Sequence, residues 1–167
     1  MSLDTLRTLL LMAGTLTMGL VAGTFALYAH TVMPGLRTTD DRTFVGAFQA
    51  LDRAIINPWF MAGGFLGALV ITLGAAVATV GEATFGWVVA ALLLYLFAFV
   101  ATVAVNVPLN DALKAAGDPA TIADLGVVRE RFDEARWAAW NLARTFTTLG
   151  AFGCLAWALL LHGRATG

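Results

Sequence analysis

A small set of polar and aromatic residues around Arg144 is the part of this sequence best suited to chemistry. Trp137, Asn141, Arg144 and Thr148 recur at three- and four-residue spacing, which places them on one face of a helix. Arg144 lies just inside an apolar stretch, where an arginine is costly, faces a bundle interior or a cavity, and needs a partner. Guanidinium and amide N–H groups stabilise oxyanions. The pattern therefore indicates that Arg144 pairs with an acid or with an anionic ligand.

Asparagines at the ends of apolar stretches are candidates for the same site, namely Asn57, Asn106, Asn110 and Asn141. Asn106 and Asn110 share a helix face only if the helix continues through Pro108, where we expect it to end or kink. The acids available to Arg144 are Asp111, Glu130, Asp133 and Glu134. A structural role predicts that these polar groups pair with one another over no cavity. A functional site predicts an apolar pocket beside them.

Metal and haem chemistry have less support in the sequence. The two histidines, His30 and His162, fall at opposite ends of the predicted bundle and cannot share a metal ion, and no CxxC or HxxE spacing supplies ligands. His30 alone can act as a general base, or as an axial ligand if the protein is a haem-binding bundle. We therefore expect no metal and no cofactor, with haem as the alternative.

Membrane-spanning helices must position these residues. The chain is 59% hydrophobic and 13% charged, whereas about a quarter of the residues of a soluble domain are charged. Four stretches without Asp, Glu, Lys or Arg can each hold a helix of the roughly 20 residues that cross a bilayer. We predict spans near 9–30, 58–80, 84–105 and 140–161. The expected fold is all-α, an antiparallel four-helix bundle forming a single domain over 1–167.

The two long connections, 31–57 and 106–139, are polar and are predicted to be partly helical. Asp40 and Asp41 can cap a helix whose apolar face carries Phe44, Phe48, Leu51 and Ile55. Asp118-Pro119 predicts the start of a second helix that runs into the fourth span. In an antiparallel bundle both connections emerge on one membrane face, together with His30 and the asparagines.

The charges of these connections indicate an orientation and exclude some partners. They hold seven of the ten cations, Arg37, Arg42, Arg53, Lys114, Arg129, Arg131 and Arg136. The positive-inside rule then predicts the long loops in the cytoplasm and both termini outside, and the expected location is a bacterial inner membrane. A net charge of −1 offers no basic surface, so we expect no nucleic-acid partner. The expected partners are membrane lipids and a small apolar substrate or ligand; the sequence is also compatible with a homo-oligomer.

Four short motifs follow one another along the chain. They are Tyr28-Ala-His-Thr-Val-Met-Pro-Gly-Leu36, Gln49…Ile56-Asn57-Pro58, Asn106-Val-Pro-Leu-Asn110 and Trp140-Asn-Leu-Ala-Arg-Thr145. This ordered set resembles the anthrone oxygenase-like family of small four-span membrane proteins. The resemblance implies a monooxygenase-type oxidation of an anthrone to an anthraquinone by molecular oxygen, without metal or flavin. The residues that carry over by motif are Asn57, Asn106, Asn110, Asn141 and Arg144.

Such a reaction suits the polar end of the bundle. A flat apolar substrate would enter an aromatic-lined pocket from the bilayer, and His30 or an acid of the third loop would remove a proton. Arg144 and asparagine amides would stabilise the enolate, which reacts with oxygen. The predicted catalytic residues are His30, Asn141 and Arg144, and the predicted substrate-binding residues are Phe48, Asn57, Trp59, Asn106, Asn110 and Trp137. The alternative is a non-catalytic membrane protein that binds a small hydrophobic ligand or a partner subunit.

Overall fold

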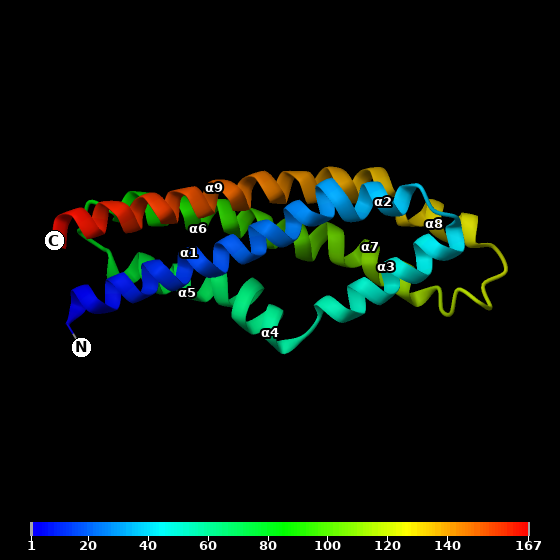
Figure 1. Cartoon of the computed structure of the whole chain (residues 1–167), viewed down its shortest axis with the longest axis horizontal. Coiled ribbons are helices and arrows are strands. Elements are labelled where there is room, and N and C mark those ends of the chain that lie inside the picture. The colour runs from blue at the N-terminus through cyan, green and yellow to red at the C-terminus, as the bar shows by residue number, and fades with distance from the viewer. Residues whose placement is uncertain (1, 167) are drawn as a thin grey trace.

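The computed structural model describes residues 2–166, and over these residues the chain forms helices joined by turns. Helical stretches that are long and apolar enough to cross a membrane cover Leu3–Arg37, Pro58–Ala78, Phe85–Ala115 and Leu125–Thr166. They lie side by side in an elongated bundle, with both chain ends at one tip and the two long connections at the other (Figure 1). The prediction of an all-α membrane bundle of four spans is confirmed.

Three of these stretches contain a short π-helical segment. In chain order the elements are α1 (Leu3–Leu27), π-helix η1 (Tyr28–Val32), α2 (Met33–Arg37), α3 (Asp41–Ile55), α4 (Pro58–Phe60), π-helix η2 (Met61–Phe65), α5 (Leu66–Ala78), α6 (Phe85–Ala101), π-helix η3 (Thr102–Asn106), α7 (Val107–Ala115), α8 (Leu125–Phe132) and α9 (Glu134–Thr166). The first stretch has 35 residues, or about 50 Å of helix. A hydrocarbon core is about 30 Å thick, so these helices extend beyond it.

Two separate apolar cores hold the molecule together. In the bundle, α1, α5, α6 and α9 contact one another around a core with many alanines, which allow helix backbones to approach closely. At the end that carries the long connections, α2, α3, α7, α8 and the first turns of α9 enclose a second core; we call this part the cap. The cap core is rich in aromatic side chains and contains Met33, Phe44, Val45, Phe48, Leu113, Phe132 and Trp137.

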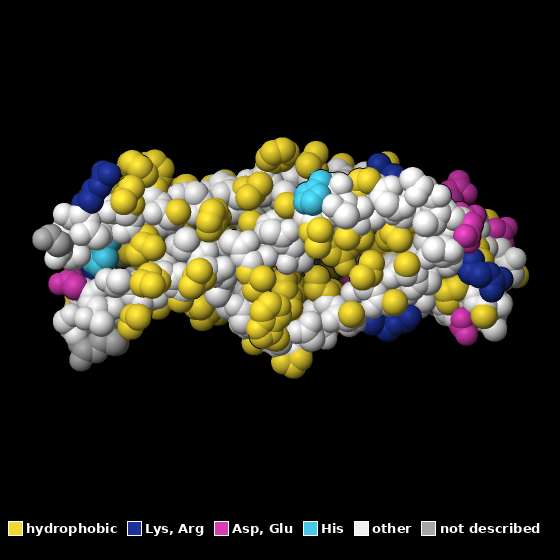
Figure 2. Space-filling view, in the orientation of Figure 1, with side chains coloured by type: hydrophobic (Ala, Val, Ile, Leu, Met, Phe, Trp, Pro, Cys, Tyr) yellow, Lys and Arg dark blue, Asp and Glu magenta, His cyan; other side chains and the backbone are white. Residues whose placement is uncertain are grey.

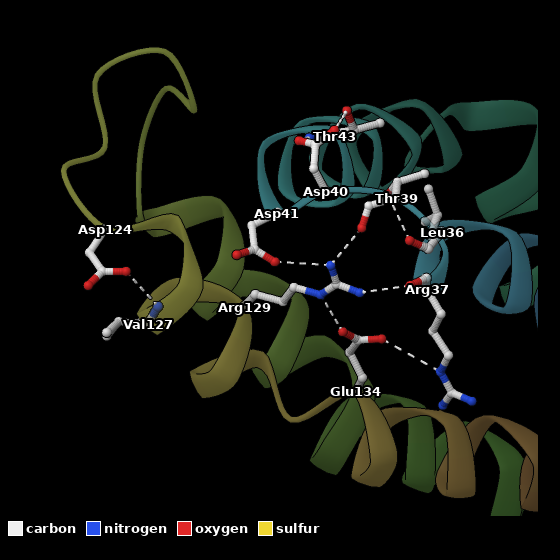
Figure 3. A network of polar contacts seen from close by, with 10 residues as sticks. All are labelled: Leu36, Arg37, Thr39, Asp40, Asp41, Thr43, Asp124, Val127, Arg129 and Glu134. Atoms are coloured by element: carbon white, nitrogen blue, oxygen red, sulfur yellow. Dashed lines mark hydrogen bonds and ion pairs between the residues drawn. The ribbon is translucent and has the colours of Figure 1, made fainter.

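Arg129 on α8 connects three segments of the cap (Figure 3). Its guanidinium donates to the carboxylates of Glu134 on α9 and Asp41 on α3, at 2.5 and 3.0 Å. It also donates to the backbone carbonyl of Thr39 at 3.0 Å. The guanidinium carbon lies 4.2 Å from the ring centroid of Phe44. Arg129 therefore has acidic and neutral partners from several elements at once.

The helices of the long connections follow the prediction only in part. Asp40 caps α3 as predicted, because its carboxylate accepts the N–H of Thr43 at 3.0 Å. Leu51 is 39% exposed, so its predicted place on the apolar face is wrong. The second predicted helix does not begin at Asp118-Pro119; α8 begins at Leu125, where the Asp124 side chain provides the N-cap. Asp133 then adopts a left-handed conformation with φ of 51° and separates α8 from α9.

The sequence predicts that the third helix ends or kinks at Pro108, and the structure shows that it does not end there. Helix continues from Phe85 to Ala115, and η3 ends two residues before the proline. A proline in an α-helix lacks an N–H and clashes with the carbonyl four residues earlier, here that of Ala104. Ala104 lies in η3, where the wider π-helical turn relieves this conflict. Asn106 and Asn110 are consequently part of one continuous helix.

Candidate active site

A cavity of about 290 Å³ lies where the bundle meets the cap. Its apolar wall combines side chains from both cores, including Phe25, Phe48, Phe60, Phe65 and Trp137. Its polar wall is formed by Thr24, Tyr28, Asp52, Thr102, Asn110, Asp111, Lys114 and Arg144. Figure 2 shows a hollow on this side of the molecule, between α1–α2 and α3–α4, with hydrophobic side chains around it. Ligand sites begin at about 300 Å³, so the space suits a small molecule.

The three π-helical segments all contribute side chains to this cavity. Tyr28 begins η1, Met61 and Phe65 bound η2, and Thr102 begins η3, and each lines the cavity. A π-helical turn inserts one residue into the helix and so changes which side chains face inward, and such turns are frequent at functional sites. The three π-helical segments therefore lie at the same level of the bundle as the cavity.

Arg144 lines the cavity as a buried cation with neutral partners. It is 6% exposed, while its neighbours Leu142 and Phe146 are 47% and 65% exposed on the outer face of α9. Its Nε and Nη2 donate to Oδ1 of Asn141 at 3.1 and 2.9 Å, and its Nη1 donates to Oγ1 of Thr102 at 3.1 Å. The guanidinium carbon lies 4.2 Å from the ring centroid of Phe25.

The predicted acidic partners of Arg144 are not found beside it. Among residues 2–166, no carboxylate lies within 4.0 Å of its guanidinium nitrogens. Asp111 pairs with Lys114 and Glu134 pairs with Arg129 instead. A buried charge without a counter-ion is costly unless a ligand supplies one. This leaves an anionic ligand as the remaining partner that the sequence predicted.

Two of the predicted asparagines hold the surroundings of Arg144 in place. Asn141 accepts both guanidinium bonds on Oδ1 and donates from Nδ2 to the backbone carbonyl of Phe25 at 3.1 Å, which fixes α9 against α1. Asn106 is fully buried and donates to the carbonyl of Trp137 at 3.2 Å, which fixes η3 against α9. These side chains therefore position the cavity wall, and neither lines the cavity itself.

A second polar cluster lies at the cap side of the cavity, around the 6%-exposed Asp52. Asn110 donates from Nδ2 to Oδ1 of Asp52 at 2.6 Å and accepts the indole N–H of Trp137 at 2.7 Å. The ammonium of Lys114 lies 2.6 Å from Oδ2 of Asp52 and 3.0 Å from Oδ1 of Asp111. The buried carboxylate of Asp52 is compensated here by the partly buried ammonium of Lys114, unlike the charge of Arg144.

The structure brings most of the predicted site residues together and places others elsewhere. Phe48, Asn110, Trp137 and Arg144 line the cavity, and Asn106 and Asn141 adjoin it. Asn57 is instead the N-cap of α4, where its Oδ1 accepts the N–H of Phe60 at 2.9 Å. Trp59 is 70% exposed. His30 is exposed on η1, with Nδ1 2.6 Å from Oγ1 of Thr31, and does not line the cavity.

Sequence reasoning did not identify several charged or polar cavity residues, chiefly Asp52 and Lys114. A signal for both was present in their spacing. Asp52 follows Phe48 by four residues on the apolar face of α3, and Lys114 follows Asn110 by four residues on α7. A charged residue in register with a core aromatic, as Asp52 is with Phe48, needs a partner for its charge. That these two are each other's partner became visible only in three dimensions.

Comparison with known proteins identifies one family. A family model described as anthrone oxygenase matches residues 57–154, which is more than half of the chain. The matched region includes Asn57, Asn106, Asn110, Asn141 and Arg144, the residues that the motif resemblance singled out. No curated protein and no solved structure matches the chain. The chain belongs to the anthrone oxygenase family.

Proposed function

We propose that this protein oxidises a flat, apolar phenolic substrate of the anthrone type with molecular oxygen, and that the cavity is its active site. The observation that carries the proposal is the state of Arg144, a buried cation in the wall of a mainly apolar cavity whose hydrogen-bond acceptors, within residues 2–166, are an amide and a hydroxyl oxygen. Such a cation favours a ligand that brings negative charge to it. The family match supports the choice of reaction.

The chemistry of an anthrone fits a site with one cation in an apolar wall. An anthrone carries a ketone and a methylene on opposite sides of its central ring. Loss of a methylene proton gives an enolate whose charge rests largely on the ketone oxygen, and a guanidinium aimed at that oxygen stabilises the anion. In this role Arg144 binds the oxyanion, Asn141 and Thr102 orient the guanidinium, and the aromatic side chains hold the rings.

The oxidation then balances with oxygen as the only oxidant. The electron-rich carbon of the enolate transfers an electron to O2 and forms a carbon–oxygen bond, which gives a peroxide. Cleavage of the oxygen–oxygen bond with loss of the second methylene proton leaves a new ketone. One atom of O2 stays in the quinone and the other leaves as water.

Access from the bilayer suits an apolar substrate. Ile56 lines the cavity, is 59% exposed, and lies at the break between α3 and α4. Neighbouring Trp59 is also exposed, so the surface around this break is apolar. We propose that this break faces the lipid. We also propose that the cap, which carries most of the basic residues, lies on the cytoplasmic side of a bacterial inner membrane.

Oxygen uptake by the purified protein in detergent, with anthrone as substrate, tests the proposal. We expect uptake above the uncatalysed rate and, with labelled O2, one labelled atom in the quinone. Arg144→Met should lose about 10²–10³-fold in rate, the usual effect of removing an oxyanion donor. The control is Arg164→Met, which removes an exposed arginine from the other end of the same helix.

Two results would count against this function. Absence of uptake above the uncatalysed rate by the wild-type protein would reject it. Binding of anthrone without oxygen uptake would favour the non-catalytic alternative, a membrane protein that binds a small hydrophobic ligand.

A further inference from the structure

The cavity carries opposite charges at its two ends. Arg144 is the cation at the bundle side, whereas Asp52 and Asp111 share Lys114 at the cap side and leave one excess negative charge there. Trp137 lies between the two ends. Its ring centroid is 5.3 Å from the guanidinium carbon of Arg144, and its indole N–H leads through Asn110 to Asp52. A ligand that fills the cavity therefore meets a cation at one end and a carboxylate at the other.

Asp52 is well placed to exchange protons with such a ligand. Its carboxylate is buried in the cavity wall and is oriented by Asn110 and Lys114, each 2.6 Å from one of its oxygens. An ionised carboxylate accepts about four hydrogen bonds, so these two donors leave room for a proton. Asp111 is the other acid that lines the cavity within residues 2–166, and its side chain is 61% exposed.

We propose that Asp52 is the catalytic base and acid of this site. The inference rests on the proposed function and deepens it. Because the ketone and the methylene of an anthrone lie on opposite sides of the central ring, a ketone bound at Arg144 directs the methylene toward the opposite end, where Asp52 lies. The same geometry defines the substrate class, a ring system with a carbonyl oxygen at one side and an acidic C–H across from it.

Asp52 accepts and returns each proton in turn. It removes one methylene proton while the electron pair of that C–H bond moves onto the ketone oxygen at Arg144. After O2 has taken one electron and the carbon–oxygen bond has formed, Asp52 returns the proton to the terminal peroxide oxygen. It then takes the second proton from the same carbon as the carbon–oxygen double bond forms and the oxygen–oxygen bond breaks. The departing hydroxide takes this proton and leaves as water, which regenerates the Asp52 carboxylate.

The test compares the wild-type protein with Asp52→Asn and with the matched control Asp124→Asn. Asp124 is an exposed acid of the cap that serves as the N-cap of α8, a role that asparagine also fills. Three quantities are measured for each protein: kcat with anthrone, the kinetic isotope effect with the methylene deuterated, and the affinity for 2-hydroxyanthraquinone as a product-like ligand. Asp52→Glu, which keeps the carboxylate, is included as the conservative variant.

We expect Asp52→Asn to lose about 10²–10⁴-fold in kcat, the usual contribution of a general base. Its isotope effect should rise, because proton removal becomes the slow step, while it still binds 2-hydroxyanthraquinone. Asp124→Asn should match the wild type, and Asp52→Glu should exceed Asp52→Asn in rate.

Several outcomes would overturn the assignment of Asp52. If the wild type is active and Asp52→Asn is equally active, Asp52 is not the base, and the proposed function stands. If Asp52→Asn loses ligand binding as strongly as it loses rate, Asp52 has a binding or structural role instead. If the wild type does not oxidise anthrone at all, both proposals fail.

Discussion

Arg129 and Arg144 are both largely buried, and the guanidinium carbon of each lies 4.2 Å from the centroid of a phenylalanine ring. They differ in whether a carboxylate compensates the charge. Arg129 is paired with two carboxylates and with backbone carbonyls in the cap (Figure 3). Arg144 has one amide and one hydroxyl, and it lines a cavity. Burial and stacking are thus common to both residues, and charge compensation is what separates them.

This difference indicates which arginine stabilises the fold and which serves a ligand. The partners of Arg129 lie on three segments, so its bonds hold the cap together. The partners of Arg144 orient the guanidinium without neutralising it, which leaves its charge for a substrate oxyanion.

Thr102→Asp should produce the largest effect, because it gives Arg144 the kind of partner that Arg129 has. The Thr102 hydroxyl oxygen is 3.1 Å from Nη1 of Arg144, so a carboxylate there would neutralise the guanidinium. We expect oxygen uptake with anthrone to fall about 10²–10³-fold, as for loss of the oxyanion donor itself. Thr102→Asn is the uncharged control of similar size. Equal activity of the two variants would show that the free charge of Arg144 is not needed.

Arg129→Met should affect stability more than turnover. Removing one partner of a buried ion pair costs about 3–5 kcal/mol, and the exposure of Asp41 and Glu134 reduces this to about 1–3 kcal/mol of unfolding free energy. Denaturation in detergent measures the change, while oxygen uptake per folded molecule should stay near the wild-type value. Loss of uptake without loss of stability would place Arg129 in the reaction and would contradict the comparison.

Thr102→Val should have a smaller effect, because it removes one uncharged acceptor from Arg144 and adds no carboxylate beside the guanidinium. A hydrogen bond to a charged group contributes about 1.5–3 kcal/mol, which corresponds to about 12- to 160-fold, and we expect a loss of oxygen uptake near the lower end because Asn141 still holds the guanidinium. The matched control is Thr24→Val, since Thr24 lines the same cavity but donates to the carbonyl of Leu20 in its own helix. A larger loss in the control than in Thr102→Val would reject the orienting role of Thr102.

Asp40→Ala should have the smallest effect, a modest loss of stability that depends on pH. The N–H and hydroxyl of Thr43 hold the pKa of the Asp40 carboxyl below its usual value of 3.8. A lowered folded-state pKa means that the contribution of the carboxylate is present above that usual value and is lost as the pH falls through the lower pKa of the folded state. The difference in melting temperature between wild type and variant should therefore shrink at acid pH. Asp40→Asn, which keeps a capping oxygen, should lose less stability at neutral pH.

The sequence was sufficient to predict the spans because the bilayer imposes a simple rule. A helix that crosses lipid cannot carry many charges, so uncharged stretches mark the spans, and one inward arginine becomes conspicuous. The Asp40 cap was predictable for a similar reason, since capping depends on residues close in sequence.

Features that depend on tertiary contacts were not predictable in this way. The third helix continues through Pro108 because a π-helical turn, η3, precedes this proline. Pro34 likewise follows η1, and each proline is the second residue after its π-helical segment. Asp52 was not predicted as a site residue because its role depends on a tertiary contact. Helix α3 lies beside α7, and Lys114 and Asn110 of α7 bind the Asp52 carboxylate. His30 is exposed although it is close in sequence to Tyr28, which lines the cavity.

The ionisation state of a bound hydroxyanthraquinone is the measurement that most directly tests whether Arg144 binds a substrate anion. The phenolate of 2-hydroxyanthraquinone absorbs at longer wavelength than the phenol, so a visible spectrum distinguishes the two forms. At a pH where the free ligand is neutral, the wild-type protein and Arg129→Met should bind it as the phenolate, and Arg144→Met should not. Phenolate binding by Arg144→Met with wild-type affinity would show that the charge of Arg144 does not form the anion site.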